Sequence, residues 1–310
     1  MSRLCVTAAV LAAPFVLLPG CGGDDSSAAA PPVAAKAPRS PGSRVIVVMM
    51  ENKERGAVIG SRDAPYVNKL AARYATPQRY YGLYHPSLPN YLGLISGSTF
   101  GVDSDCTDCI QHSRTIVDQL QAAHVSWRAY MEGMPRACFT GAGAGRYAKK
   151  HNPFVYFHSV IDVPKRCAKV VPGTQLAADM KAGRLPRFVF FTPDLCNDTH
   201  DCSVAHGDRY LSQLIPSLLR QLGPRGFLVL AWEEGDSDAG CCGGLARGGL
   251  VPVVIAGPSV RRGARPTVPV SHYSLLRTIE DAFGLPHLRN AGAAATKPLD
   301  AAFTRPPRLR

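Results

Sequence analysis

The sequence predicts an α/β domain in which a mostly parallel β-sheet is covered by helices on both faces. Two observations indicate this fold class. Short, continuous apolar runs recur along the chain, as is typical of strands that are buried on both faces. Helical patterns with 3.6-residue spacing lie between these runs, and strands that alternate with helices favour parallel pairing. About 270 residues follow the N-terminal segment, which is enough for one large domain with a sizeable core.

Four apolar runs are the expected strands, and two leucine-containing patterns are the expected helices. The strands are residues 44–50, 188–192, 227–232 and 251–256. One helix is expected around residues 211–222, with a bend at Pro216, and another where Leu276, Ile279 and Phe283 share a face. No internal repeat is visible. Ligands of such sheets gather at the carboxyl ends of the strands, so the polar residues after each run are the first candidates for a functional site.

The segments at the two ends of the chain are expected to lie outside the domain. Residues 1–20 have a basic start and an apolar run of the length found in signal peptides. The run ends in Leu18-Pro19-Gly20-Cys21, which resembles a bacterial lipobox and makes Cys21 the expected lipidation site. An ordinary secretory signal is the alternative. Residues 21–43 are predicted to be a flexible tether, residues 44–290 the domain, and residues 291–310 a basic, proline-containing tail. The expected location is therefore extracytoplasmic, either anchored to the cell membrane or secreted.

The composition excludes several classes of protein. Hydrophobic residues make up 46% of the chain and charged residues 19%, so it is neither disordered nor a coiled coil. Lys and Arg outnumber Asp and Glu by 35 to 23, and the net charge of +12 favours anionic surfaces or substrates. The basic residues are scattered, with no basic block interleaved with aromatic residues, so nucleic-acid binding is not expected. No feature predicts an obligate protein partner.

The cysteines indicate disulfides. Eight remain when Cys5 in the signal segment and Cys21 are set aside, and an even number in an exported chain favours pairing. Cys106 and Cys109 have the spacing of half a zinc site, but no second pair completes it. The adjacent Cys241 and Cys242 are left open. The local pairs Cys106–Cys109, Cys138–Cys167 and Cys196–Cys202 are predicted.

Acidic residues follow two of the expected strands. Glu51 and Asn52 come directly after the first strand, and Glu233, Glu234 and Asp236 come after the strand that begins at residue 227. Acidic side chains crowded together repel one another, and a divalent cation with oxygen ligands would relieve the repulsion. An acidic, solvated loop is the alternative.

A serine begins a third expected helix. Leu88, Leu92 and Ile95 have helical spacing, with Ser87 near the start of the helix. Ser87 would be an N-cap in the simplest interpretation. The same position also suits a nucleophile, because the N–H groups at a helix N-terminus face an anion and a metal ion can stabilise the serine alkoxide. Asn90 is a candidate donor to a phosphoryl oxygen.

Histidines and further acids supply candidate proton-transfer groups. Residues 192–208 are dense in such side chains, and His200 lies between Asp198 and Asp201, which would fix its tautomer and raise its basicity. A polar disulfide loop is the alternative. His151 and His272, taken one at a time, would be ordinary structural histidines.

Six segments together resemble the phosphoesterase family that contains bacterial phospholipases C and secreted acid phosphatases, within the alkaline-phosphatase-like superfamily. The resemblance covers residues 44–286. It implies a three-layer α/β/α sandwich. The segments are Met50–Lys53, His85–Tyr91, His151–Phe154, Leu195–Cys202, Trp232–Asp236 and His272–Glu280.

The resemblance also implies the roles of the site residues. One divalent metal ion of unknown identity would be held by Glu51, Asn52, Ser87, Glu233 and Glu234, and Ser87 would be phosphorylated and then dephosphorylated by water. Asn90 matches a phosphate-contacting asparagine. His85, His151, His200 and His272 would stand where classical alkaline phosphatases carry a second metal. The chain departs from the family where Glu233 replaces the usual Asp and where Asp194 replaces a common Asn.

The function implied is metal-dependent hydrolysis of phosphate esters through a phosphoserine. An acid-phosphatase-like phosphomonoesterase is favoured, because phospholipases C of this family usually have extra C-terminal domains. A phospholipase C-like phosphodiesterase and an inactive surface lipoprotein that binds phosphorylated ligands are the alternatives. A sulfatase is disfavoured, because Tyr91 stands where the sulfatase motif requires Arg.

Overall fold

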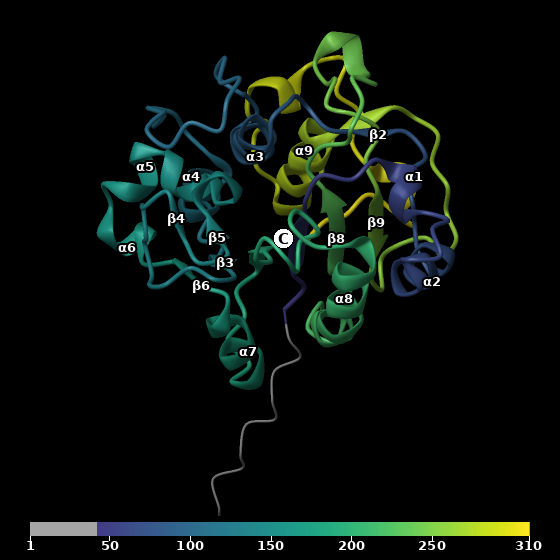
Figure 1. Cartoon of the computed structure of the whole chain (residues 1–310), viewed down its shortest axis with the longest axis horizontal. Coiled ribbons are helices and arrows are strands. Elements are labelled where there is room, and N and C mark those ends of the chain that lie inside the picture. The colour runs from purple at the N-terminus through teal and green to yellow at the C-terminus, as the bar shows by residue number, and fades with distance from the viewer. Residues whose placement is uncertain (1–41, 310) are drawn as a thin grey trace, which may run out of the picture. The chain divides into compact units, whose positions relative to one another are not determined.

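The central element of the fold is a six-stranded sheet (Figure 1). The computed structural model describes residues 42–309. The strand order is β6-β3-β7-β1-β8-β9, and every neighbouring pair is parallel except β8 and β9. The predicted, mostly parallel α/β sheet is therefore confirmed. The strands are β1 (Val45–Met50), β3 (Trp127–Met131), β6 (Val170–Pro172), β7 (Phe188–Thr192), β8 (Phe227–Trp232) and β9 (Val253–Ala256).

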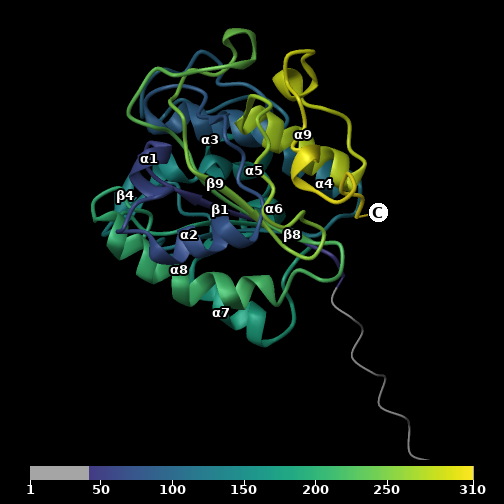
Figure 2. The same cartoon turned by 90° about the vertical axis from the view of Figure 1, so that its right-hand side faces the viewer.

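Helices form a layer on each face of this sheet (Figure 2). One layer contains α2 (Pro65–Arg73), α7 (Thr174–Lys181) and α8 (Val204–Leu219). The other contains α3 (Ser87–Ser96), α4 (Ile116–Ala122) and α9 (His272–Phe283). Within the layers α2 packs on α8, and α3 packs on α9. The three layers are those of the expected α/β/α sandwich.

Short elements complete the described part of the chain. They are the helices α1 (Arg55–Val58), α5 (His158–Ile161) and α6 (Pro164–Cys167), the paired strands β2 (Tyr80–Tyr81) with β10 (Val270–Ser271) and β4 (Gly143–Ala144) with β5 (Tyr147–Ala148), and the 3₁₀ helices η1 (Lys149–His151), η2 (Pro153–Tyr156), η3 (Cys242–Gly244), η4 (Arg289–Gly292) and η5 (Asp300–Ala302).

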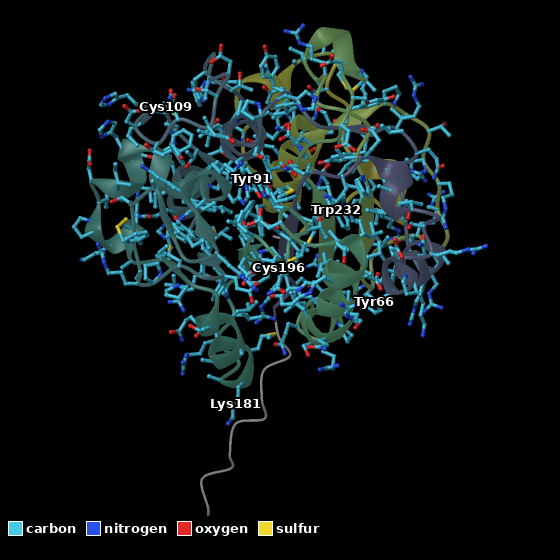
Figure 3. All side chains as sticks on the ribbon, viewed as in Figure 1. Tyr66, Tyr91, Cys109, Lys181, Cys196 and Trp232 are labelled. Carbon is cyan, nitrogen blue, oxygen red and sulfur yellow. A yellow bond between two sulfur atoms is a disulfide. The ribbon has the colours of Figure 1, made fainter. Side chains whose placement is uncertain are left out.

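The register of the neighbouring strands β1 and β8 places the acidic residues together. β1 is buried along its whole length, and so is β8. Met50 at the end of β1 lies opposite Trp232 at the end of β8. Glu51 directly follows β1, and Glu233 directly follows β8. Because the strands are parallel, both carboxylates leave the same edge of the sheet. Figure 3 shows Trp232 in the interior, together with Tyr91 of α3.

The predicted helices form where the sequence places them. α8 contains Pro216 within its length, and Ser203 caps its start by accepting a hydrogen bond from the backbone N–H of His206. α9 contains the predicted face of Leu276, Ile279 and Phe283, all of which are buried. The three local disulfides are confirmed, and Cys241 pairs with its neighbour Cys242.

The domain continues past the boundary expected at residue 290. Leu299, Phe303 and Leu309 are buried in the main core, and the ring of Phe303 contacts that of Phe227 with centroids 4.9 Å apart. Residues 291–309 therefore pack as part of the domain rather than as a separate tail, because their apolar side chains cover the end of the sheet where β8 begins.

The predicted signal segment, Cys21 and nearly all of the tether lie outside the described residues. Within residues 42–309, no helix is long and apolar enough to span a bilayer.

Candidate active site

Three glutamates converge at the carboxyl ends of β1 and β8. Glu51 and Glu233 have no solvent exposure, and Glu234 is 6% exposed. The backbone holds them in place: the N–H of Glu233 donates to the carbonyl of Met50 at 3.1 Å, and the N–H of Glu51 donates to the carbonyl of Asp198 at 2.8 Å. We call Glu51, Glu233 and Glu234 the carboxylate cluster.

The hydroxyl of Ser87 lies among these carboxylates. Its Oγ is 3.3 Å from Oε2 of Glu51, 3.2 Å from Oε1 of Glu233 and 3.2 Å from Oε1 of Glu234. Ser87 is the first residue of α3, the N-cap position before it is occupied by Pro86, and the Ser87 hydroxyl donates toward the carboxylates. One hydroxyl hydrogen serves only one of three acceptors at a time. The geometry therefore places Ser87 in the cluster rather than in the role of an N-cap.

Asn52 adds an amide to the cluster. Its backbone N–H donates to Oε2 of Glu233 at 2.8 Å. One terminal atom of its amide lies 2.7 Å from Oε1 of Glu233 and 3.0 Å from Oε1 of Glu234. The amide of Asn52 has two possible orientations. If this atom is the nitrogen, it donates to both carboxylates; if it is the oxygen, it becomes a further oxygen ligand for a cation.

Burial makes the ionised cluster costly without a cation. Burial raises the pKa of Glu51 to about 8, with a further contribution from Asp198. Burial also raises the pKa of Glu233, and the charge of Glu51 adds to the shift. The pKa of Glu234 is raised by burial as well, although His85 opposes the shift. Paired acids of this kind hold protons at neutral pH unless a positive charge replaces the protons.

Two further side chains contact Glu51. The hydroxyl of Tyr91, one turn along α3 from Ser87, donates to Oε1 of Glu51. Nε2 of His151 lies 3.0 Å from Oε2 of Glu51, and its Nδ1 lies 3.4 Å from Oδ2 of Asp198. Among the described residues, neither His151 Nε2 nor Asp198 Oδ2 has a hydrogen-bond partner of good geometry.

His200 and Lys150 lie beside this group. Nδ1 of His200 is 2.7 Å from Oδ1 of Asp201, and the backbone N–H of His200 donates to Asp198 at 2.8 Å. Nε2 of His200 is 3.3 Å from Nζ of Lys150, which also donates to Oδ2 of Asp105 at 2.9 Å. Burial on its own would lower the pKa of Lys150, but the bond to Asp105 raises it above its usual value. Lys150 therefore carries a positive charge at the edge of the site.

His85 binds the outermost member of the cluster. Its Nδ1 is 2.5 Å from Oε2 of Glu234, and its Nε2 is 3.1 Å from the carbonyl of Ser237. Burial opposes protonation, but the contact with Glu234 raises the pKa of His85 overall.

Two expected site residues have other partners. Nε2 of His272 lies 2.6 Å from the carbonyl oxygen of Glu233 and its Nδ1 lies 2.9 Å from the hydroxyl of Tyr80, so the ring binds the backbone of the cluster instead of facing it. The amide of Asn90 accepts from the N–H of Leu83 at 2.6 Å and donates to the carbonyl of Tyr84 at 2.7 Å. Asn90 thus organises the loop before Ser87, and in this geometry its amide is not free for a phosphoryl oxygen.

The family model for the phosphoesterase family matches residues 57–286. The chain belongs to the phosphoesterase family. A phosphatidylinositol-3-phosphatase of Mycobacterium tuberculosis is 33% identical over 246 residues, which cover 79% of this chain and 78% of the relative. A phosphate-repressible acid phosphatase of Penicillium chrysogenum is 31% identical over 234 residues, which cover 72% of this chain but 55% of the relative. The family assignment makes the chain a hydrolase that acts on phosphoric ester bonds.

Solved structures support the fold of this phosphoesterase. A protein of the alkaline phosphatase superfamily from Vibrio parahaemolyticus matches with a TM-score of 0.55 and 10% identity, over 82% of this chain and 72% of that one. At this identity the likeness concerns the fold alone.

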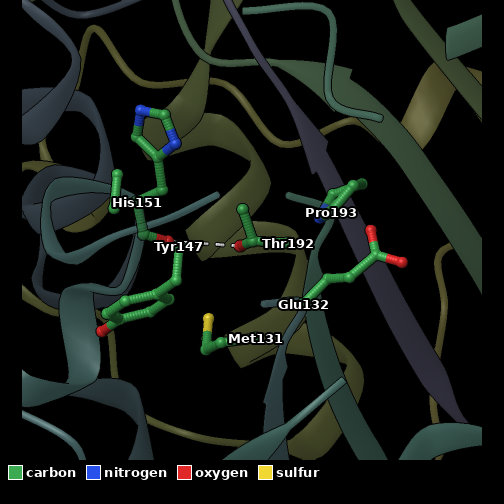
Figure 4. Close-up of a pocket in the computed structure, with 7 residues that line it drawn as sticks. Met131, Glu132, Tyr147, His151, Thr192 and Pro193 are labelled. Carbon is green, nitrogen blue, oxygen red and sulfur yellow. Dashed lines mark hydrogen bonds between the residues drawn. The ribbon is translucent and has the colours of Figure 1, made fainter. Parts of the chain in front are cut away.

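The structure separates Asp194 from the carboxylate cluster of the phosphoesterase. Oδ1 of Asp194 accepts from the N–H groups of Cys196 and Asn197 at 3.0 and 2.9 Å, which closes a turn. Its own N–H donates to Glu132 at 2.9 Å. Figure 4 shows Glu132 beside Pro193, while His151 lies across a small pocket and its carbonyl accepts from Thr192 at 3.2 Å. Asp194 therefore supports the loop that carries Asp198 and His200.

The oxygen donors of the cluster fit a divalent cation. Three carboxylates, an amide and a hydroxyl are the ligand types that hard and borderline cations prefer. Two unpartnered atoms lie next to this set. Nε2 of His151 faces Glu51, and Oδ2 of Asp198 faces the other ring nitrogen of His151. Cys196, Cys202 and His206 also lie close together, but the two sulfurs form a disulfide and are not available as thiolates.

Sequence reasoning missed three members of the site. Lys150 stands next to the assigned His151, and Tyr91 lies in the motif that contains Ser87, so both were within reach of a motif-based argument. Asp105 lies in a loop with no recognisable pattern, and only the folded chain brings it to Lys150.

Proposed function

We propose that this phosphoesterase is a metal-dependent phosphomonoesterase in which Ser87 is the nucleophile. The observation that carries the proposal is the position of the Ser87 hydroxyl, within 3.3 Å of three buried carboxylates. Buried acids gathered around a serine do not stabilise the fold, because they lower the free energy of unfolding when they are ionised. A cation bound by Glu51, Asn52, Glu233 and Glu234 would supply charge stabilisation for the alkoxide and the phosphoryl oxygens.

The residues of the chain then have distinct tasks. Ser87 passes its hydroxyl proton to a carboxylate of the cluster and attacks phosphorus in line, so that the bond from Oγ to phosphorus forms as the bond to the leaving oxygen breaks. The Ser87 oxygen takes this proton back when the phosphoserine is cleaved. Tyr91 and His151 hold Glu51, and His85 holds Glu234, so that the cluster stays in place around the nucleophile. Water later cleaves the phosphoserine and restores Ser87.

His200 is the proposed proton donor to the leaving oxygen. The contact between Nδ1 and Asp201 fixes the ring, which leaves Nε2 as the nitrogen that exchanges a proton with the leaving oxygen. The same nitrogen would later accept a proton from the attacking water, as microscopic reversibility requires. Lys150, 3.3 Å from that nitrogen, is positioned to contact a phosphoryl oxygen.

The positive charge at Lys150 favours a monoester substrate. A phosphate monoester carries up to two negative charges at the reacting group, whereas a diester carries one, and a cation beside the cluster stabilises the former more. The names of the relatives, a phosphatidylinositol phosphatase and acid phosphatases, support the same choice. A phospholipase C-like diesterase is the alternative. The lipobox-like segment supports an extracytoplasmic location on the membrane.

Release of p-nitrophenol from mono- and bis-(p-nitrophenyl) phosphate tests the proposal. We expect turnover of the monoester that is lost on chelation and restored by one divalent metal, with a stoichiometry of about one ion per chain by elemental analysis. Faster turnover of the diester would favour the phosphodiesterase. Full monoester activity in protein that elemental analysis shows to be free of metal would refute metal dependence.

A further inference from the structure

We propose that Tyr84 and Arg247 form a subsite for a second anionic group, carried by the leaving group of the substrate. The inference rests on the proposed hydrolysis of phosphate esters and specifies which esters the site prefers. The shared chemistry of the preferred substrates is a second phosphate or phosphodiester attached to the leaving oxygen through a short spacer.

A hollow beside the carboxylate cluster provides the space. It has a volume of about 490 Å³ and is lined by Tyr84, His85, Asp238 and Arg247. A second hollow of about 390 Å³ shares His85 and Asp238 with the first and reaches Asn52 and Glu234. His85 thus stands between the cluster and Arg247. A substrate whose phosphoryl group lies at Ser87 would extend its leaving group past His85 into the first hollow.

Arg247 offers an uncompensated positive charge to this hollow. Its Cζ lies 5.2 Å from the centroid of the Tyr84 ring, so the guanidinium rests on an aromatic face. Within residues 42–309, no carboxylate lies within 4.0 Å of the Arg247 guanidinium. A planar guanidinium with free N–H groups is the side chain best suited to bind a phosphate through two hydrogen bonds.

Asp238, the acidic residue that lines the hollow, lies near His85. Asp238 is 95% exposed in its side chain and lies 4.0 Å from Nε2 of His85. An exposed carboxylate of this kind is strongly screened by solvent and opposes an anion at Arg247 only weakly.

Backbone pairing fixes Arg247 relative to the nucleophile. The N–H of Arg247 donates to the carbonyl of Leu83 at 2.9 Å, and that of Gly248 donates to the carbonyl of Gly82 at 3.0 Å. A Cβ at Gly248 would lie 2.7 Å from backbone atoms of Tyr84, so this close approach requires glycine.

The paired segment is also tied to the helix that carries Ser87. Asn90 of α3 accepts from the N–H of Tyr84 at 3.1 Å, and it donates to the carbonyl of the same residue at 2.7 Å. The backbone of Arg247 is therefore held in place before any substrate binds, and the ring of Tyr84 supports its guanidinium. A site arranged in advance in this way can discriminate between leaving groups. In Figure 1 the segment around Arg247 is part of the green ribbon above the end of β8.

Matched substrate pairs test the subsite. The soluble pair is 1,4-butanediol bisphosphate and 4-hydroxybutyl phosphate, which differ only in the second phosphate. The lipid-derived pair is a short-chain phosphatidylinositol monophosphate and inositol monophosphate, in which the second anion is a phosphodiester. The readout is the ratio of kcat/KM within each pair. Arg262→Ala is the control, because Arg262 is exposed and follows β9 at the end of the sheet opposite Glu233.

We expect the unaltered protein to prefer the doubly anionic member of at least one pair by about tenfold, and Arg247→Ala to abolish that preference. Arg247→Lys should retain part of it, and Arg262→Ala all of it. If the preference occurs in one pair alone, that pair shows whether the second anionic group of the preferred substrate belongs to a soluble molecule or to a lipid. An unchanged ratio in Arg247→Ala, or no preference in the unaltered protein, would overturn the subsite.

If the protein hydrolyses no ester, that result contradicts the proposed function and leaves the subsite to be tested by binding. The following experiment measures binding without turnover. Calorimetric titration with butane-1,4-bisphosphonate and with butylphosphonate compares one and two anionic groups without turnover. We expect about tenfold tighter binding of the bisphosphonate, lost in Arg247→Ala. Equal affinities in the unaltered protein would refute the subsite independently of catalysis.

Discussion

Nε2 of His272 lies 2.6 Å from the backbone carbonyl oxygen of Glu233. Burial lowers the pKa of His272 to about 4, so the ring is neutral at neutral pH and carries its hydrogen on the nitrogen that donates to this carbonyl. The hydroxyl of Tyr80 donates to the other ring nitrogen. His272 therefore contacts the loop of Glu233 and Glu234, and we expect it to act as a positioning residue rather than in proton transfer.

Replacement of His272 should weaken metal binding. We expect His272→Ala to lower metal affinity and kcat by roughly tenfold to a hundredfold, as is usual when a group that orients a ligand is removed. His272→Gln, whose amide can donate to the same carbonyl, should recover part of both. Metal titration and pH–rate profiles measure the effects. Normal metal affinity together with loss of one limb of the pH–rate profile would instead make His272 an acid or base.

Lys150 should contribute to transition-state stabilisation. Because it carries a charge beside His200 and Asp105, we expect Lys150→Ala to reduce kcat/KM for p-nitrophenyl phosphate by roughly 10²–10³. The loss for the bis-ester should be smaller. Lys149→Ala is the matched control, since the adjacent Lys149 binds the carbonyl of Thr107 instead. Equal losses in the two variants would show that Lys150 acts only through folding.

Glu280 should make stability depend on pH. It has no solvent exposure, and burial raises its pKa from 4.5 to about 8. The folded state therefore holds this proton more tightly than the unfolded state, and the contribution of Glu280 to the free energy of unfolding falls as pH rises from about 4.5 to about 8. We expect Glu280→Gln to raise the stability at pH 8 relative to pH 5 by on the order of 1 kcal/mol or more. Denaturant unfolding at pH 5 and pH 8 measures the free energy of unfolding of both proteins. If Glu280→Gln changes this free energy equally at the two pH values, the raised pKa of Glu280 is contradicted.

Cys21 should determine membrane attachment without affecting catalysis. The lipobox-like segment predicts that Cys21→Ser moves the protein from the membrane fraction to the soluble fraction, with unchanged kcat for p-nitrophenyl phosphate. Fractionation followed by activity assay measures both. Retention of Cys21→Ser in the membrane fraction would exclude the lipid anchor.

Much of the site was predictable because strand ends carry local signals. The apolar runs before Glu51 and Glu233 identify buried strands, and parallel pairing of β1 with β8 then brings the two acids together. Lys150 and Asp105 were not predictable in this way, since their contact joins two loops that share no periodic pattern. His272 was assigned to the site by its motif, but only the folded structure shows that its ring nitrogens bind Tyr80 and a carbonyl. The packing of residues 291–309 was missed because charge and proline content concealed a few well-spaced apolar residues.

The turnover of Ser87→Ala tests the central claim most directly. Ser96→Ala is its control, because Ser96 ends the same helix, is fully buried, and its hydroxyl bonds only to backbone groups of Leu92 and Ser98. With both variants folded and loaded with metal, we predict that kcat for p-nitrophenyl phosphate falls by at least about three powers of ten in Ser87→Ala, equivalent to about 4 kcal/mol of barrier, and stays near normal in Ser96→Ala. Near-normal kcat in folded, metal-loaded Ser87→Ala would contradict the account and assign Ser87 to the structure of the helix alone.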